Sequence, residues 1–150
     1  MKERIGQILD TASARAKQNQ SPYFGDITAA EAWELLQAAE DAVLVDVRTG
    51  AEQDFVGRVP GAIEIPLKNY PGMTPNADFL AQVKSAVKPE QTVVFLCRSG
   101  VRSVAAAQML TTEGYTRAMN ILEGFEGDKN ELGHRRVNGW KMAGLPWSQG

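Results

Sequence analysis

The sequence predicts an α/β fold with a mostly parallel sheet, and three observations support this prediction. Short apolar runs of strand length alternate with longer segments in which apolar residues recur at helical spacing. The runs at 42–47 and 92–96 are almost continuously apolar, as strands buried on both faces of a parallel sheet are. The predicted order is strand, helix, strand, strand, helix, strand, helix, strand, which is typical of α/β proteins. A chain of 150 residues, 43% hydrophobic and 23% charged, is long enough for one domain with a buried core.

The N-terminal stretch predicts an amphipathic helix over residues 2–18, where Ile5, Ile8 and Leu9 begin an apolar stripe at helical spacing. Because the stripe is narrow, this helix can dock on its own domain, pair with a second copy or fray. We favour docking, and we expect a monomer or a homodimer. A Ser-Pro and a glycine then mark a linker. We therefore divide the chain into a helix and linker at 1–22 and a folded domain at 23–150.

The next elements are an edge strand, a helix and an inner strand. Residues 26–28 predict a short edge strand that runs into the helix start. Thr28 and Glu31 match the capping-box pattern, in which each side chain satisfies a backbone donor at the helix N-terminus. This helix should end near Ala39, and the apolar run at 42–47 should follow it as an inner strand.

The middle of the chain predicts a short strand, a surface loop and a second amphipathic helix. Residues 62–65 alternate and are closed by a proline, whereas 68–76 hold two prolines and a glycine and are expected to form an irregular loop. Asp78 is the expected cap of a helix over 78–87. Asp46 interrupts the preceding inner strand near its carboxyl end, and a buried carboxylate requires a partner.

The last third predicts a polar loop after the run at 92–96, then a helix, a strand and a tail. Ser103 can cap the helix, which should end near Gly114, a natural C-terminal stop. Residues 118–122 form the last predicted strand. The tryptophan-containing end of the chain should pack back on the domain.

Composition and charge exclude several classes of function. A net charge of -2 gives no general attraction to nucleic acid or to an anionic membrane. One cysteine and one histidine cannot form an internal disulfide, a cysteine-rich zinc site or a histidine-based metal site, so we expect no metal and no cofactor. No apolar stretch approaches the ~20 residues of a membrane span, and the N-terminus lacks the apolar middle of a secretory signal. Its acidic residues argue against a mitochondrial presequence, so we expect a cytoplasmic protein.

The chemistry is concentrated where the single cysteine, Cys97, follows the central strand and precedes a helix. This is the edge at which open α/β sheets usually bind ligands. The free N–H groups of the helix start favour an anion, and Gly100 allows successive N–H groups to form an anion-binding nest. Arg98 and Arg102 add planar guanidinium groups that suit oxyanions. We therefore predict that Cys97 is a nucleophile and that the substrate-binding residues are Arg98, Ser99, Gly100, Val101, Arg102 and Ser103.

Each of these features has a plain structural explanation when taken alone. A cysteine after an apolar strand is commonly a core residue, two loop arginines are commonly solvated, and a glycine can simply serve a turn. Their combination within six consecutive residues, at a strand-to-helix turn, favours an active-site loop.

Residues 97–102, with the sequence CRSGVR, resemble the active-site loop of the rhodanese family of sulfurtransferases. Other segments resemble further signatures of that family in the same order: 46–48 with Glu52 and Phe55, then 59–66, 122–125 and 139–146. The resemblance covers roughly Ile27 to Trp147. It implies a rhodanese-like domain, with helices on both faces of a mostly parallel sheet.

The resemblance also implies a mechanism. Cys97 attacks the outer sulfur of an anionic donor, either thiosulfate-like or a persulfide, and carries that sulfur as a persulfide. A thiol or cyanide then accepts it, in a two-step scheme. The expected partners are thus a small anionic sulfur donor and a thiol acceptor, with a sulfur-relay protein as a further possible partner. No general base is needed if the surroundings of the thiol favour the thiolate.

Two other functions remain open at this point. The first is a phosphatase or arsenate reductase of the same fold, but these relatives have a loop one residue longer, which makes room for a tetrahedral oxyanion. Cys97 and Arg102 enclose only four residues, which favours transfer of a single sulfur atom. The second is a non-enzymatic sulfur carrier or docking module.

Asp46 and Arg48 are the candidate supporting residues. By resemblance, Asp46 accepts hydrogen bonds from the active-site loop or from Arg102, and Arg48 pairs with Glu52. Purely structural pairing is the alternative that we favour for both.

The segment 126–138 is longer than the usual family connection. It contains His134, Arg135 and Arg136, which can reach the active-site mouth or a partner. A solvated loop is the interpretation that we favour.

Overall fold

The computed structural model describes residues 2–135 and 137–149. Its centre is a five-stranded sheet in the order β1-β7-β6-β2-β3, in which every neighbouring pair is parallel. The strands are β1 (Gly25–Ile27), β2 (Ala42–Asp46), β3 (Ile63–Glu64), β6 (Thr92–Leu96) and β7 (Ala118–Ile121). The predicted α/β fold is therefore confirmed, with β6 at the middle of the sheet and β1 at one edge.

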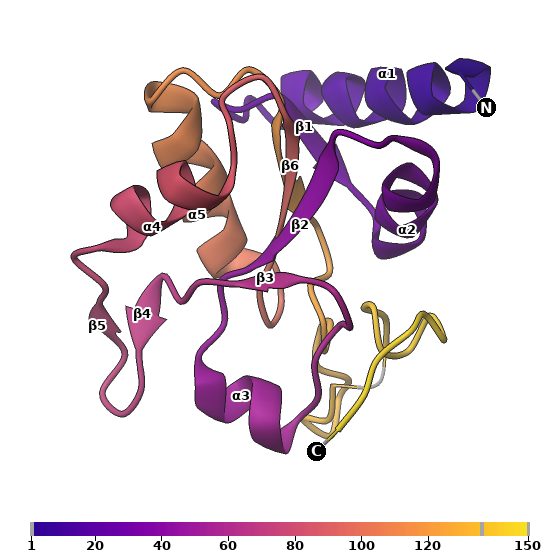
Figure 1. The fold of residues 1–150 in the computed structure, drawn as a ribbon. Helices are drawn as coiled ribbons and strands as arrows, with labels where there is room; N and C mark the ends of the chain where they lie inside the picture. Colours follow the sequence, from indigo (N-terminus) through magenta and orange to yellow (C-terminus); the bar gives the residue numbers. More distant parts are fainter. Residues whose placement is uncertain (1, 136, 150) are drawn as a thin grey trace.

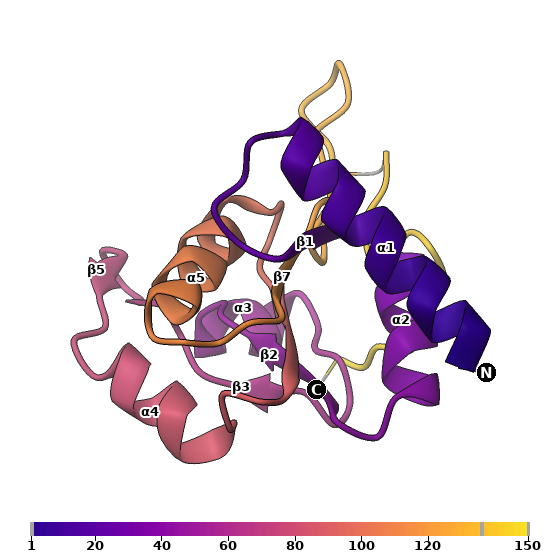
Figure 2. The same ribbon diagram turned by 90° about the horizontal axis from the view of Figure 1, so that it is seen from above.

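Helices cover both faces of this sheet (Figures 1 and 2). On one face lie α1 and α2, and on the other lie α4 and α5. The helices are α1 (Lys2–Gln18), α2 (Ala29–Ala38), α3 (Gly50–Phe55), α4 (Phe79–Ala86) and α5 (Val101–Thr112). Alternate side chains of β6 point to opposite faces, so Val93 and Phe95 join the α4/α5 core while Val94 and Leu96 join the α1/α2 core.

Two segments contain regular structure that was not predicted from the sequence. Residues 50–55 form α3, whose start is fixed by a capping box between Thr49 and Glu52. Residues 68–76 were expected to be irregular but include a two-stranded antiparallel hairpin, β4 (Lys68–Asn69) and β5 (Thr74–Pro75). The predicted Asp78 cap is also wrong, because its side chain makes no capping hydrogen bond.

The helix α1 docks on its own domain, as predicted. Its buried residues Ile8 and Ala12 join the core between the sheet and α2. Gly25 allows this close approach, because a Cβ at that position would lie 2.9 Å from Cβ of Ala12. Arg15 adds an ion pair to Glu31, with 2.6 Å between Nη1 and Oε1. The proposed division at residue 22 stays a prediction.

The C-terminal tail packs back on the domain, as expected from its tryptophans. Trp140 is completely buried, and its ring meets that of Trp33 edge-on at a centroid distance of 6.0 Å. Arg58 and Ser148 form an antiparallel bridge that ties the tail to the segment after α3. Within the part of the chain that the structure describes, no helix has the length and apolar character needed to span a membrane.

Candidate active site

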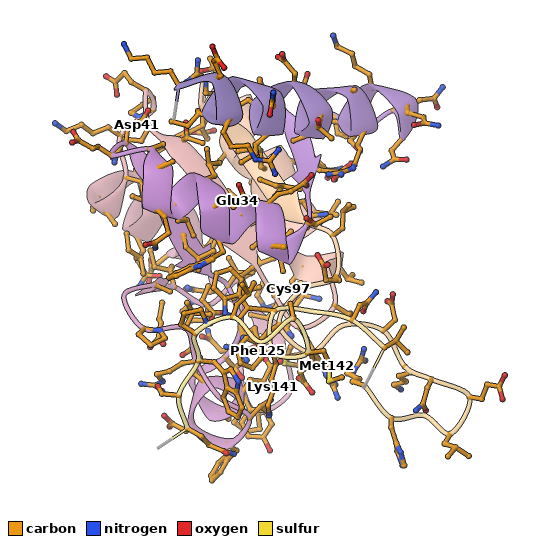
Figure 3. All side chains as sticks on the ribbon, turned by 90° about the vertical axis from the view of Figure 1, so that its right-hand side faces the viewer. Glu34, Asp41, Cys97, Phe125, Lys141 and Met142 are labelled. Carbon is orange, nitrogen blue, oxygen red and sulfur yellow. The ribbon has the colours of Figure 1, made fainter. Side chains whose placement is uncertain are left out.

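Cys97, labelled in Figure 3, follows directly on the carboxyl end of β6 and precedes the short loop that leads into α5. The residue is only 1% exposed. The backbone N–H of Gly100 donates to Sγ at 3.0 Å, and Oγ of Ser103 lies 3.2 Å from the same sulfur. The loop therefore encloses one sulfur atom and offers it a backbone donor.

Gly100 gives the loop its shape. It stands at the N-cap of α5 with a φ of 97°, in the left-handed region that favours glycine. A Cβ there would overlap the carbonyl oxygen of Leu122. Ser103, which the sequence suggested as the cap, lies inside the helix instead, and its hydroxyl faces Cys97.

A segment after β7 supports the loop from below. The N–H of Phe125 donates to the carbonyl of Cys97 at 2.8 Å, and the N–H of Glu126 donates to the carbonyl of Arg98 at 2.9 Å. Gly124 allows this contact, because a Cβ there would lie 2.6 Å from the Arg98 carbonyl oxygen. Figure 3 shows Phe125 close to Cys97. The first turn of the loop is thus fixed by backbone hydrogen bonds.

Arg102 is held by Glu52 of α3. Its Nη1 and Nη2 donate to the two carboxylate oxygens at 2.7 and 2.8 Å, which is a bidentate ion pair. Burial alone would raise the pKa of Glu52, but the hydrogen bonds from Arg102 and Thr49 outweigh it and lower that pKa to about 2. The predicted pairing of Glu52 with Arg48 is wrong, since Arg102 occupies the carboxylate.

Arg48 pairs with Asp46 instead, and both side chains are fully buried. Nε and Nη2 of Arg48 donate to the Asp46 carboxylate, Nη2 also donates to the Gly57 carbonyl at 2.8 Å, and the guanidinium lies over the Phe125 ring at 4.2 Å. The expectation that Asp46 accepts from the active-site loop or from Arg102 is therefore wrong. Asp46 and Arg48 thus pair with each other, and the purely structural role that we favour for both stays a prediction.

Arg98 is the more accessible arginine of the loop. Its side chain is 47% exposed and forms an ion pair with Glu126 at 3.0 Å. A pocket of about 360 Å³ lies beside the loop, and it is lined by Thr49, Glu52, Val56, Tyr70, Met73, Arg98, Arg102 and Glu126. Each loop arginine thus faces a carboxylate within the pocket wall, and the remaining wall is largely apolar.

The other loop residues differ in accessibility. Val101 is 75% exposed, Ser99 is half-buried, and Ser103 is fully buried. The structure therefore brings Gly100 and Ser103 to the sulfur and Arg98 and Arg102 to the neighbouring pocket. Val101 points its side chain to solvent.

Part of the long 126–138 segment also approaches this region. Arg135 donates to the Gly127 carbonyl at 2.7 Å and lines a smaller pocket with Val56 and Glu126, two residues that also line the first pocket. His134 is exposed, and Arg136 lies outside the described residues. The structure thus places Arg135 next to the site.

Two polar residues of the site were not identified from the sequence. Asn120 accepts a hydrogen bond from Ser103 at 2.5 Å, and it donates to Asp26 at 3.3 Å. Asn120 and Asp26 are buried in strands that are otherwise apolar, and a single polar residue within an apolar run is the signal by which the sequence could have identified them.

Among residues 2–135 and 137–149, no three His, Cys, Asp or Glu side chains gather as a metal site requires.

Comparison with known proteins agrees with this geometry. Residues 28–131 match the family model of the rhodanese-like domain. An uncharacterized protein of Rickettsia conorii is 36% identical over 81% of this chain and 95% of its own length, and a sulfurtransferase of Allochromatium vinosum is 32% identical over 74% of this chain and 82% of its own. The crystal structure of Rv0390 from M. tuberculosis superposes with a TM-score of 0.79, at 43% identity, over 85% of this chain and 99% of that one. The chain therefore belongs to the family of rhodanese-like domains.

Proposed function

We propose that this protein is a sulfurtransferase that moves a sulfane sulfur from an anionic donor to a thiol or cyanide acceptor through a persulfide on Cys97. The observation that carries the proposal is the enclosure of the sulfur, which receives the Gly100 N–H at 3.0 Å. The loop between Cys97 and Arg102 contains four residues, and this short length favours the transfer of a single sulfur atom over that of a larger tetrahedral oxyanion. The similarity to a curated sulfurtransferase supports the same chemistry.

In the first step the Cys97 thiolate attacks the outer sulfur of the donor. A new S–S bond forms on Cys97 while the bond between the outer sulfur and the rest of the donor breaks. With thiosulfate, sulfite leaves with the electron pair of that bond. Arg98 is the accessible cation at the pocket mouth and guides the anionic donor there.

In the second step the acceptor attacks the outer sulfur of the persulfide. The S–S bond breaks, Cys97 leaves as a thiolate, and the acceptor keeps the transferred sulfur. No external reductant or oxidant is consumed, because each step passes one neutral sulfur atom from one nucleophile to another and the leaving group keeps the electron pair of the broken bond. The loop N–H groups stabilise negative charge on the sulfur in both steps.

The charge balance of the pocket indicates which donors fit best. Glu52 neutralises Arg102, and Glu126 offsets part of the charge of Arg98. The apolar side chains of Val56, Tyr70 and Met73 supply much of the remaining wall. Because little net charge remains in a largely apolar pocket, a persulfide with an organic group fits it at least as well as a thiosulfate-like anion. We propose these two classes of donor and a thiol as the cellular acceptor, and we place the reaction in the reducing cytoplasm.

The assay is cyanide-dependent thiocyanate formation from thiosulfate. The proposal predicts activity in the intact chain and complete loss in Cys97→Ser, with the thermal unfolding midpoint retained. Aryl phosphate hydrolysis that depends on Cys97, without sulfur transfer, would favour the phosphatase instead. Fast transfer from a protein persulfide without turnover of free thiosulfate would identify a sulfur carrier.

A further inference from the structure

A buried chain of polar side chains runs from Cys97 across the sheet to its edge strand. Sγ of Cys97 lies 3.2 Å from Oγ of Ser103, which donates to Oδ1 of Asn120 at 2.5 Å. Nδ2 of Asn120 then donates to Oδ1 of Asp26 at 3.3 Å. All four residues are at most 2% exposed, so water does not compete for these hydrogen bonds.

The strand register explains why these residues meet. Asn120 of β7 lies opposite Phe95 of β6 on one side and opposite Asp26 of β1 on the other. Because paired residues of neighbouring strands share a face, Asp26 and Asn120 lie side by side on the face that α5 covers. Ser103 reaches the same row from α5.

Asp26 anchors the far end of this chain as a carboxylate. It accepts hydrogen bonds from Tyr23 Oη at 2.6 Å and from Ser21 Oγ and Asn19 Nδ2, both at 3.1 Å. Burial and the hydrogen bond to Asp26 raise the pKa of Tyr23 to about 12, so the phenol remains a donor. Every side chain that contacts the carboxylate therefore donates to it, and three of these donors come from the linker after α1.

These contacts fix the direction of each hydrogen bond. Asn120 must turn its NH₂ group to Asp26, because the opposite orientation would place an amide oxygen against a carboxylate oxygen. Its Oδ1 then faces Ser103 and can only accept. Since a serine hydroxyl has a single proton, Ser103 offers Cys97 a lone pair and accepts from its S–H group.

We propose that Asp26 and Asn120 are positioning residues that hold the Ser103 proton away from Cys97 and so favour the thiol over the thiolate. To donate to the thiolate, the Ser103 hydroxyl must rotate and give up Asn120. An amide does not pass a proton along, so the chain sets an orientation and is not a path for proton transfer. The inference rests on the proposed function only in taking Cys97 as the nucleophile.

Other charged groups also act on the sulfur, and a test has to keep them constant. Arg102 is one of them: burial alone would lower its pKa, but the hydrogen bond to Glu52 raises it, and attraction to Cys97 adds to this rise. The strands, helices and loops packed around Cys97 carry the ion pairs Arg102–Glu52, Arg98–Glu126 and Arg48–Asp46, and the buried chain itself ends in Asp26 and Tyr23. Replacing Asn120 changes none of these charges, so its effect isolates the Ser103 hydroxyl.

The test is a pH titration of the Cys97 thiolate by its ultraviolet absorbance, with the same protein carrying Cys97→Ser subtracted to remove the tyrosines. Asn120→Leu keeps the side-chain shape and frees the Ser103 hydroxyl to donate to the sulfur. A hydrogen bond to a charged group is worth about 1.5 kcal/mol or more, so the midpoint should fall by about one pH unit. Tyr115→Phe removes a buried hydroxyl outside the chain, which donates to the Val87 carbonyl, and should leave the titration unchanged.

Ser103→Ala decides whether the shift passes through the hydroxyl. The proposal predicts that Asn120→Leu lowers the midpoint in the native background and has no effect in the Ser103→Ala background. An unchanged midpoint in Asn120→Leu, or an equal shift in both backgrounds, overturns it. If Asn120→Leu does not fold, Asp26→Asn releases the amide orientation at constant shape. Because this change also removes a charge, a shift is expected in both backgrounds, and the proposal then requires a larger fall of the midpoint in the native background than in the Ser103→Ala background. The titration needs no sulfur donor, so its outcome is independent of whether sulfur transfer is observed.

Discussion

Glu52 and Arg102 are fifty positions apart in the sequence and form a bidentate ion pair beside the active-site loop. Nη1 and Nη2 of Arg102 donate to the two carboxylate oxygens at 2.7 and 2.8 Å. The pair joins α3 to the first turn of α5, and so it fixes one wall of the pocket. It also removes most of the positive charge that Arg102 would otherwise offer to a substrate. We therefore expect the preference among donors to depend on this ion pair more than on the residues of the cysteine loop alone.

Glu52→Gln should increase the affinity for small dianionic donors. The change releases the Arg102 guanidinium toward the pocket, and we expect the KM for thiosulfate to fall about fivefold, the equivalent of about 1 kcal/mol. Asp54→Asn is the matched control, because it removes the same charge from the same helix but faces Arg58. Steady-state kinetics on both variants make the comparison, and an unchanged or higher KM in Glu52→Gln contradicts it.

The same ion pair should make stability depend on acid pH. The pKa of Glu52 is lowered from its ordinary value of 4.5 to about 2, because the Arg102 and Thr49 hydrogen bonds outweigh burial. A lowered pKa in the folded state stabilises the protein above the ordinary value, and this contribution is lost as the pH falls from 4.5 toward 2. Urea unfolding across this range should show a shallower loss of stability in Glu52→Gln than in the native chain. If stability fell equally steeply with pH in both proteins, the ion pair would contribute nothing to the pH dependence of stability.

Asp46→Asn should destabilise the fold without touching the cysteine loop. The change leaves the Arg48 guanidinium buried with its charge unpaired, which costs about 3–5 kcal/mol in free energy of unfolding. Glu34→Gln breaks the exposed pair with Arg4 and should have a far smaller effect on urea unfolding. A loss of less than about 1 kcal/mol in Asp46→Asn would show that the buried pair is not required.

Gly100→Ala should abolish activity and lower stability. A Cβ at this position overlaps the Leu122 carbonyl oxygen and opposes the φ of 97°, so the loop must move away from the Cys97 sulfur. Gly61 is a matched control, because its φ of 84° carries the same strain of about 1–2 kcal/mol, while no heavy atom beyond its two chain neighbours lies within 4 Å of its Cβ position. Gly61→Ala should therefore lose stability and keep its rate of thiocyanate formation. Full activity in Gly100→Ala would exclude a role for the loop geometry.

The parts of the fold that depend on local pattern could be predicted from the sequence. The apolar runs of β2 and β6 and the capping box of α2 are read from adjacent residues, and the structure confirms them. The cysteine loop is contiguous, and for that reason its residues could be named in advance. The helix α3 was missed although Thr49 and Glu52 carry the same capping pattern as Thr28 and Glu31.

Contacts between distant segments could not be predicted in the same way. Arg48 had two carboxylates within reach by sequence, and the choice of Asp46 over Glu52 depends on how α3 lies against α5. The meeting of Asp26 with Asn120 depends on the register of two parallel strands that are 94 residues apart. Such pairings follow from tertiary packing, which periodicity alone does not specify.

Intact-mass spectrometry after exposure to thiosulfate and to a small organic persulfide tests the central claim most directly. Since Cys97 is the only cysteine in the chain, the account predicts a gain of one sulfur atom with at least one donor, removal of that mass by cyanide or a thiol, and no gain in Cys97→Ser. An unchanged mass with both donors, in protein whose thiol is intact and reduced, would contradict sulfur transfer through Cys97.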